Sequence, residues 1–138
     1  MLTASLSASE LRYRRLFEAA HDGILIVDPD TRRIVDVNPF LIKFLGYAHE
    51  EFIGKELFEI GLLEDETASQ AAFHELLMSG FIRYEDLPLQ TKAGRCVDVE
   101  FVSNLYDEGG RKVIQCNIRD ITERKKSENA LREAKRKL

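Results

Sequence analysis

The sequence predicts a single domain of the α+β class. Three observations carry this prediction: the length of 138 residues, the change of hydrophobic period along the chain, and the spacing of the turn residues. The length suits one ordinary domain and is too short for two. The pattern gives a helix, two strands, a helical stretch and then three antiparallel strands. Hydrophobic residues make up 44% and charged residues 32%, which is typical of a soluble domain with a packed core.

The N-terminal part predicts a helix followed by a β-hairpin. Ser7 and Glu10 have the spacing of a capping box. The apolar residues that recur on one face of this helix are Tyr13, Leu16, Phe17 and Ala20. A β-branched run over residues 23–27 predicts a strand that is buried on both faces. Residues 33–37 predict the strand that pairs with it across a polar turn.

The next segment predicts three short helices. Asn38 stands before a proline, so we expect it to cap a helix that ends at Gly46. Residues 50–58 predict a second helix, whose start is weak because an alanine occupies its cap position. Residues 67–79 predict a third helix that ends at Gly80. The apolar face of this third helix consists of Phe73, Leu76 and Leu77.

Three antiparallel strands and a charged tail complete the chain. The strands are expected over residues 81–91, 96–106 and 112–119, with turns between them. In the tail, residues 123–138, ten of sixteen residues are Lys, Arg or Glu. A sparse heptad stripe runs through it, formed by Ser127, Leu131, Ala134 and Leu138. One narrow apolar seam predicts a solvated helix or the first heptads of a coiled coil.

Several motifs, taken in order, resemble the PAS domain family. The matching segments are residues 13–18 with 22–24, 34–39, 45–47 with 50–54, 92–95, and 119–125. The last of these contains the Asp-Ile-Thr motif with which the family leaves its sheet. Ala93 stands where the family more often has aspartate. The match covers about residues 10–126.

The resemblance implies a PAS fold, which is a five-stranded antiparallel sheet with short helices on one face, an N-terminal flanking helix and a C-terminal linker helix. It divides the chain into an N-terminal extension (1–9), a sensory domain (10–122) and the start of a coiled-coil linker (123–138). The flanking helices would form a homodimer through Tyr13, Leu16, Phe17, Leu131, Ala134 and Leu138. We expect the linker to lead to an output domain, most often the histidine kinase of a two-component phosphorelay.

Catalysis and metal binding find no support in the sequence. A nucleophile needs a base within reach, and no Cys or Ser stands in a motif that would pair with His21, His49 or His74. Cys96 and Cys116 are too few and too isolated for a zinc site or a disulfide framework. We therefore expect no enzyme activity in this chain, although the parent protein could be a histidine kinase.

No cofactor is expected either. Flavin-binding relatives carry a reactive cysteine in the central helical segment, and residues 54–61 contain none. Val99 and Ile118 stand where those relatives use amide side chains. Haem-binding relatives ligate iron through a histidine on the helix before the third strand. His74 lies on that helix, so a haem-binding gas or redox sensor is kept as an alternative.

A small apolar or amphipathic ligand is the remaining possibility. Alternation places a set of residues on the inner face of the sheet: Leu87, Leu89, Val97, Val99, Phe101, Ile114, Cys116 and Ile118. Arg83 and Glu85 share that parity, and we expect them at the mouth of a pocket. The competing interpretation is that the same residues form only a packed core.

The exit from the sheet predicts a transmission site at Asp120 and Thr122. Either side chain can cap the tail helix, and in the family this pair ties the last strand to the linker. Function is therefore predicted as a regulatory module that dimerises, senses a ligand and controls a C-terminal output domain. A second alternative is a ligand-free dimerisation module of a cyclic-di-nucleotide or transcription regulator.

Charge and hydropathy limit the partners. The net charge is −4 with no basic stripe, which argues against nucleic acid as a partner. No apolar run is long enough to insert in a membrane, and no signal peptide is evident. We expect a cytoplasmic location, in a parent protein that is either soluble or membrane-anchored.

Overall fold

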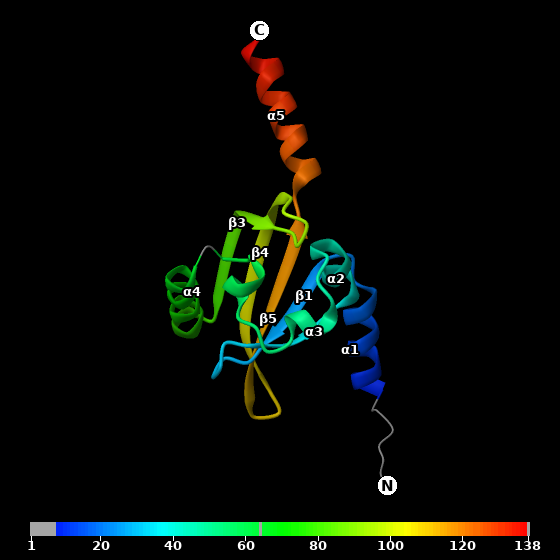
Figure 1. The fold of residues 1–138 in the computed structure, drawn as a ribbon, viewed down its shortest axis with the longest axis vertical. Helices are drawn as coiled ribbons and strands as arrows, with labels where there is room; N and C mark the ends of the chain where they lie inside the picture. Colours follow the sequence, from blue (N-terminus) through cyan, green and yellow to red (C-terminus); the bar gives the residue numbers. More distant parts are fainter. Residues whose placement is uncertain (1–7, 64, 138) are drawn as a thin grey trace.

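The computed structural model describes residues 8–63 and 65–137. One sheet forms the centre, and a long C-terminal helix projects from its end (Figure 1). The elements are α1 (Ala8–Ala19), β1 (Gly23–Val27), β2 (Ile34–Val37), α2 (Pro39–Leu45), α3 (His49–Phe52), the 3₁₀ helix η1 (Leu57–Ile60), α4 (Glu66–Ser79), β3 (Phe81–Gln90), β4 (Cys96–Glu108), β5 (Arg111–Asp120) and α5 (Thr122–Arg136).

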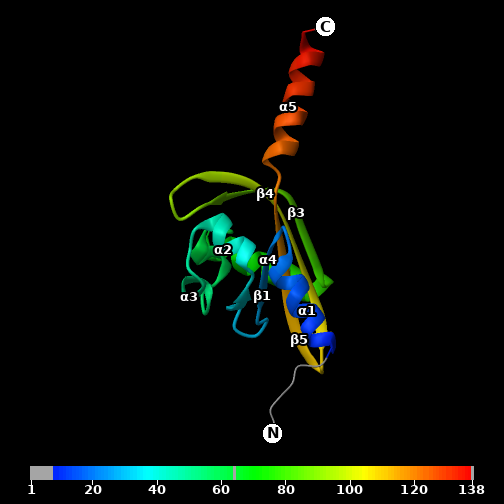
Figure 2. The same ribbon diagram turned by 90° about the vertical axis from the view of Figure 1, so that its right-hand side faces the viewer.

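The five strands pair in the order β2-β1-β5-β4-β3, and every pairing is antiparallel. The β1–β2 hairpin and the β3–β4–β5 meander therefore meet where β1 pairs with β5. Helices α2, α3 and α4 lie on one side of this sheet (Figure 2). The α+β fold and the five-stranded sheet predicted from the sequence are confirmed.

Strand β1 has the bounds that its β-branched run predicted. Its burial alternates, because Leu25 and Val27 are fully buried while Ile24 and Ile26 are only half-buried. The prediction of burial on both faces was therefore wrong. Helices cover one face of the sheet, and the other is only partly shielded.

The helix predicted over residues 50–58 is broken into α3 and η1. The backbone between them pairs with β2 instead: the amide of Gly54 donates to the carbonyl of Ile34 at 2.9 Å, and the amide of Ile34 donates to Lys55 at 2.8 Å. Gly54 takes a positive φ of 83° at this point. A glycine tolerates that conformation, so tertiary pairing with the edge strand wins over continued helix.

Other local signals are close to the structure. Asn38 caps α2, and Gly46 and Gly80 end α2 and α4 in the left-handed conformation. Helix α4 begins one residue earlier than expected because the Asp65 side chain caps it, accepting from the amide of Ala68 at 2.9 Å. Leu77, predicted on its buried face, is 49% exposed.

The core lies between the sheet and helices α2 to α4. The largest fully buried side chains include Phe52, Phe101, Leu25, Leu41 and Ile118. These residues come from helices and strands far apart in the sequence, and they pack together in one cluster. Among the described residues, no helix is both long and apolar enough to cross a membrane.

Candidate functional site

The exit junction lies where β5 ends and α5 begins. The carboxylate of Asp120 accepts hydrogen bonds from the amide of Thr122, at 2.9 Å, and from its hydroxyl, at 2.5 Å. Helix α5 begins at Thr122 itself, and the preceding residue, Ile121, makes no side-chain cap. Neither predicted side chain occupies the cap position: Thr122 is the first helical residue, and Asp120, one residue before the cap position, accepts from its amide and hydroxyl.

Ile121 anchors this junction, although its sequence signal was not recognised. Its side chain is only 3% exposed, and its amide donates to the carbonyl of Asp98 on β4 at 3.2 Å. The start of α5 is therefore held to the sheet by one apolar side chain and three hydrogen bonds. An apolar residue between two polar ones was the available clue.

The first turn of α5 also binds β3, which the sequence did not predict. The ammonium of Lys125 lies 2.9 Å from the carboxylate of Asp86 and 3.2 Å from that of Asp98. Hydrogen bonding to Asp86, then to Asp98, raises the pKa of Lys125 above its ordinary value. The guanidinium of Arg124 donates to the carbonyl of Glu85 at 3.3 Å. We call these contacts of Arg124 and Lys125 the α5 clamp.

The clamp binds a β-bulge. Tyr84 pairs with Phe101 and Leu87 with Val99, so Glu85 and Asp86 together oppose the single residue Glu100. The extra residue reverses the facing of side chains along β3. Before the bulge the even-numbered residues of β3 face inward, and after it the odd-numbered residues do.

The bulge explains why part of the predicted pocket is misplaced. Arg83 pairs with Val102 and lies on the outer face of the sheet, where its guanidinium contacts the carboxylate of Glu100 at 2.7 Å. Glu85 lies in the bulge and is exposed. Neither residue lies at the mouth of an inner pocket. The prediction was wrong because it assumed that side chains alternate without interruption along the whole strand. Leu87 and Leu89, after the bulge, do face inward.

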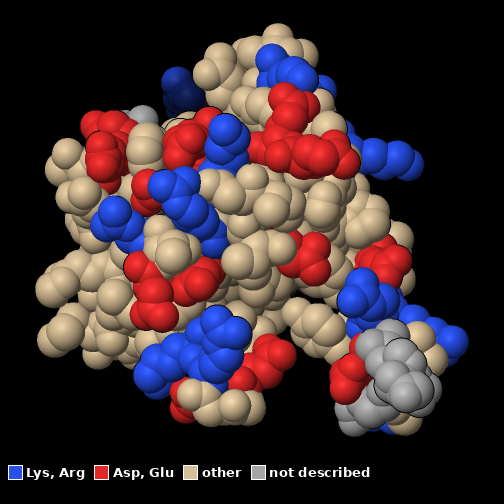
Figure 3. Space-filling view, turned by 60° about the horizontal axis from the view of Figure 1, so that its bottom comes forward, with Lys and Arg blue, Asp and Glu red and all other residues tan. Residues whose placement is uncertain are grey.

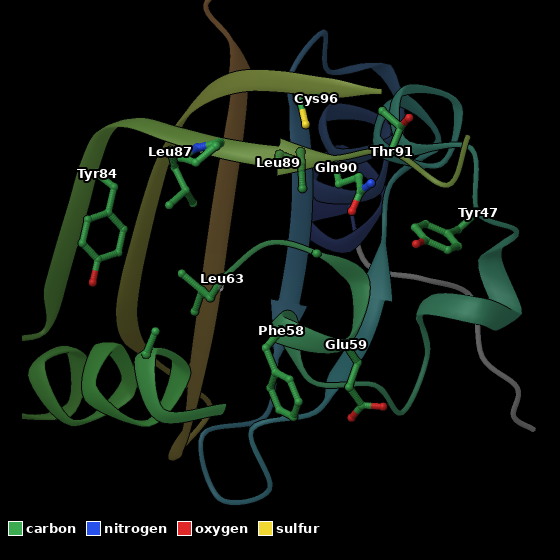
Figure 4. Close-up of a pocket in the computed structure, with 13 residues that line it drawn as sticks. Tyr47, Phe58, Glu59, Leu63, Tyr84, Leu87, Leu89, Gln90, Thr91 and Cys96 are labelled. Atoms are coloured by element: carbon green, nitrogen blue, oxygen red, sulfur yellow. The ribbon is translucent and has the colours of Figure 1, made fainter. Parts of the chain in front are cut away.

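An open groove of about 670 Å³ runs between β3 and the segment from η1 to α4 (Figure 4). Tyr84, Leu87 and Leu89 form its β3 wall, and Leu63 and Phe58 line it from the opposite side. The remaining lining includes Tyr47, Glu59, Gln90, Thr91 and Cys96. The groove thus combines an apolar body with a carboxylate and several hydrogen-bonding groups.

The inner face of the sheet is closely packed. Val97, Val99, Phe101, Ile114, Cys116 and Ile118 are all buried there, at 8% exposure or less. The void that remains beside Phe101, Ile114 and Cys116 measures about 10 Å³. That volume is at the limit for one water molecule. Phe101, Ile114 and Cys116 line this void, while Leu87 and Leu89 line the open groove.

Two polar side chains meet in this apolar interior. The hydroxyl of Ser103 donates to the thiol sulfur of Cys116 at 2.9 Å. Burial raises the pKa of Cys116 to about 12, and the Ser103 hydrogen bond offsets only part of that effect. The neutral thiol is therefore the stable form, and Cys116 is a core residue without reactive character.

The histidine named for haem does not face this interior. His74 lies on α4 and is exposed. The void of about 10 Å³ holds no space for a porphyrin. Among residues 8–63 and 65–137, no group of three His, Cys, Asp or Glu side chains could hold a metal ion. His74 is therefore not placed to ligate a haem inside this void.

The flanking helices leave different residues exposed than predicted. Phe17 of α1 is 6% exposed, because it packs into its own domain. Tyr13 and Leu16 are 47% and 68% exposed, and Leu131 of α5 is 57% exposed. Ala134 is also exposed. The predicted heptad residue Leu138 and the predicted capping residue Ser7 lie outside the described residues.

Charges of both signs alternate on the surface. Lys and Arg side chains are interspersed with Asp and Glu on the end of the molecule shown in Figure 3. That face presents no continuous basic patch of the kind that tracks a phosphate backbone. Elsewhere, Arg119 on β5 pairs with Asp22, which follows the end of α1, at 3.1 Å.

The fold and the exit junction define a class of protein: a sensory domain of signalling proteins, in which an antiparallel sheet continues into a C-terminal helix. The family model for the PAS domain matches residues 21–123. The chain belongs to the PAS domain family. As such it is a sensory module and not itself a catalyst.

Its relatives are parts of larger signalling proteins. A methyl sulfide methyltransferase-associated sensor from Methanosarcina acetivorans is 33% identical over 128 residues, which is 93% of this chain and 13% of the relative. Sporulation kinase E of Bacillus subtilis is 29% identical over 94% of this chain and 17% of its own length. Diguanylate cyclase DgcM of Escherichia coli K12 is 29% identical over 96% of this chain and 34% of its own length.

Solved structures agree. A domain of a sensory box sensor histidine kinase/response regulator from Geobacter sulfurreducens superposes with a TM-score of 0.71 at 28% identity. The superposition covers 81% of this chain and 94% of that domain. The chain spans between 13% and 34% of each curated relative named above, so it corresponds to one module of those proteins.

Proposed function

We propose that this module controls an output domain attached beyond α5, and that this output domain is a histidine kinase of a two-component phosphorelay. The observation that carries the proposal is the exit junction. Asp120, Ile121 and Thr122 connect the last strand rigidly to a helix that buries no residue of its own. A change in the sheet would therefore be passed directly to the direction of α5.

Homodimerisation is the second part of the proposal. Tyr13 and Leu16 on α1, and Leu131 on α5, are apolar side chains left exposed on helices with few other contacts. A second copy of the chain would cover them. Phe17 is excluded from this interface because it is already buried in its own domain. Leu131 and Ala134 supply the heptad positions within the described part of α5.

Ligand sensing is the third part, and we place it in the open groove beside β3. The groove offers apolar walls and the Glu59 carboxylate, which fits a small amphipathic molecule with a cationic or hydrogen-bond-donating end. The proposal needs neither flavin nor haem. It assigns the module to the cytoplasmic side of signalling, with no nucleic acid or membrane contact of its own.

The ligand assignment is tested with matched eight-carbon probes, n-octylammonium and octanoate. Amide chemical shifts in titrations should change along Phe58–Leu63 and Tyr84–Thr91 and favour the ammonium probe. The matched variant Glu59→Gln, which keeps a cap acceptor for the amide of Glu56, should remove that preference. Equal shifts for both probes, or shifts confined to residues 114–118, would count against the groove.

The dimer and the output are tested separately. Light scattering after size exclusion should give twice the 15.8 kDa chain mass, and Leu131→Glu should shift the chain toward monomer. The exposed residue Leu77 on α4 supplies the control variant Leu77→Glu. For output, the chain is fused through α5 to a histidine kinase core. Autophosphorylation that is the same with Asp120→Ala as with the native module would contradict the proposal.

A second output remains to be compared. A relative of this chain is a diguanylate cyclase, so a fusion to a cyclase core provides the parallel test. If only the cyclase fusion responds to the Asp120→Ala change, the alternative of a cyclic-di-nucleotide regulator is preferred over a kinase.

A further inference from the structure

The β3 bulge lies between the groove and the output helix. Tyr84 and Leu87, the residues on either side of it, both line the groove. Glu85 and Asp86, the bulge itself, are held by Arg124 and Lys125 of α5. Two residues of the groove wall are thus direct neighbours in the chain of Glu85 and Asp86, which contact α5.

We infer that this bulge is a second transmission route, by which filling the groove changes the orientation of α5 through the α5 clamp. The inference rests on the proposed function in taking the groove as the ligand site and α5 as the output helix. It is distinct from the Asp120–Thr122 junction, because the clamp joins α5 to β3 at the sheet edge, whereas the junction joins α5 to β5.

The packing of α5 makes the clamp important. None of its described residues is buried, so no apolar contact along the helix sets its direction. Ile121 and the Asp120 contacts fix where the helix starts. Arg124 and Lys125, which lie in its first turn, add a second constraint on the direction it takes from that point.

The strength of the clamp suits a switch. Its pairs are partly exposed, with Lys125 at 33%, Asp86 at 53% and Asp98 at 43% side-chain exposure. Exposed ion pairs are individually weak and exchange readily. Lys125 also has two carboxylate partners on different strands, Asp86 on β3 and Asp98 on β4. If a ligand in the groove moved the two strands apart, Lys125 could keep its ion pair with only one of the two carboxylates.

The bulge is also the part of β3 that can move. Strand β3 is an edge strand, and the ladder to β4 is already interrupted between Tyr84 and Leu87. A displacement there breaks no regular ladder pairing. The same displacement elsewhere in β3 would cost backbone hydrogen bonds.

Hydrogen–deuterium exchange of the 138-residue chain tests the clamp first. Lys125→Gln should raise exchange across residues 122–130 by about two- to fivefold, the range expected for losing exposed pairs. The matched control is Lys126→Gln, whose side chain pairs with Glu123 of the same helix and with no other acidic side chain in the described part of the chain. Equal exchange in the two variants would overturn the inference.

Coupling to the groove is tested second, with Ala68→Phe, which adds a ring to the groove lining at a position on α4, outside both the bulge and α5. It should change exchange in residues 122–130 in the native background and not in the Lys125→Gln background. Glu59→Trp, which fills the groove from η1, repeats the test should Ala68→Phe fail to fold. An equal change in both backgrounds, or none in either, would refute the route.

The two proposals fail separately. A kinase fusion that ignores the module, while Ala68→Phe still acts on α5 through Lys125, rejects the proposed output and leaves the clamp standing. A fusion that responds to Asp120→Ala, while Lys125→Gln behaves like Lys126→Gln, keeps the output and removes the clamp.

Discussion

The side-chain amide of Asn38 holds the end of helix α1, because its nitrogen donates to the carbonyl of Phe17 at 3.0 Å. The same nitrogen donates to the carbonyl of Asp22, also at 3.0 Å. Its oxygen accepts from the amides of Ile24, at 2.9 Å, and Leu41, at 3.3 Å. Asn38 is fully buried, so one side chain joins α1, β1 and α2 with all its hydrogen-bonding positions used.

Asn38→Asp should therefore destabilise the domain by about 2–4 kcal/mol, because an ionised carboxylate cannot donate and would face two carbonyl oxygens. Urea unfolding followed by circular dichroism measures the change. The control is Asn104→Asp on the exposed side of β4, which should cost less than about 0.5 kcal/mol. Similar losses for the two variants would mean that Asn38 acts only as a helix cap.

Gly23→Ala should destabilise the domain by about 1–3 kcal/mol through overpacking. A Cβ at Gly23 would lie 2.6 Å from Cδ1 of Leu41 and 3.2 Å from its Cβ, in the contact between β1 and α2. The cost should fall when Leu41→Ala is already present, because the nearest obstructing atom, Cδ1, is gone and only the Cβ at 3.2 Å remains. A double-mutant cycle by urea unfolding measures this coupling, and strict additivity would contradict the contact.

Stability should fall as pH rises above 9, because Cys116 has a pKa of about 12 in the folded state and an ordinary value of 9.0. The unfolded thiol loses its proton first, so stabilisation from this group is complete below pH 9 and is lost between pH 9 and 12. The slope approaches about 1.4 kcal/mol per pH unit.

Urea unfolding between pH 8 and 10 measures this slope while limiting the contribution of Tyr13, whose pKa is raised from 10.0 to about 12 by burial. Cys116→Val should flatten the dependence, and Cys96→Val, at the exposed cysteine, should leave it unchanged. Identical slopes in the native chain and in Cys116→Val would assign the effect to other groups.

The inner void should bind no small apolar molecule in the native chain. Its volume of about 10 Å³ excludes benzene, whereas Phe73→Ala removes a ring that lines it. That variant should lose about 3–5 kcal/mol of stability and regain part of it in saturating benzene. Leu77→Ala, at a half-exposed site on the same helix, is the control. A benzene-induced rise in the melting temperature of the native chain would reveal an inner pocket.

Local signals in this sequence translated well into structure. One helix begins after Asn38, which precedes a proline, and two helices end at Gly46 and Gly80, which follow apolar runs. These limits were as expected, because caps depend on atoms within a few residues. Strand β1 and the turns around Gly94 and Gly110 followed for the same reason. The chain order of these elements, with the Asp-Ile-Thr motif, was enough to indicate the fold.

Non-local pairing caused the errors. The backbone of Gly54 and Lys55 pairs with Ile34, some twenty residues away, and this interrupts a helix that local pattern favoured. The bulge at Glu85 and Asp86 moved Arg83 to the outer face, and no turn residue marks it. The exposure of Leu77 likewise depends on where α4 lies against the sheet.

The sequence by itself determined the elements, their order, the caps and the family, because each is recorded in spacings of a few residues. Only the tertiary structure decided which apolar residues form a packed core, where the open groove lies, and that Lys125 reaches Asp86 across 39 positions of chain. Such contacts depend on how strands pair and where a bulge falls, and burial free energy summed over the whole fold, not any local pattern, sets both.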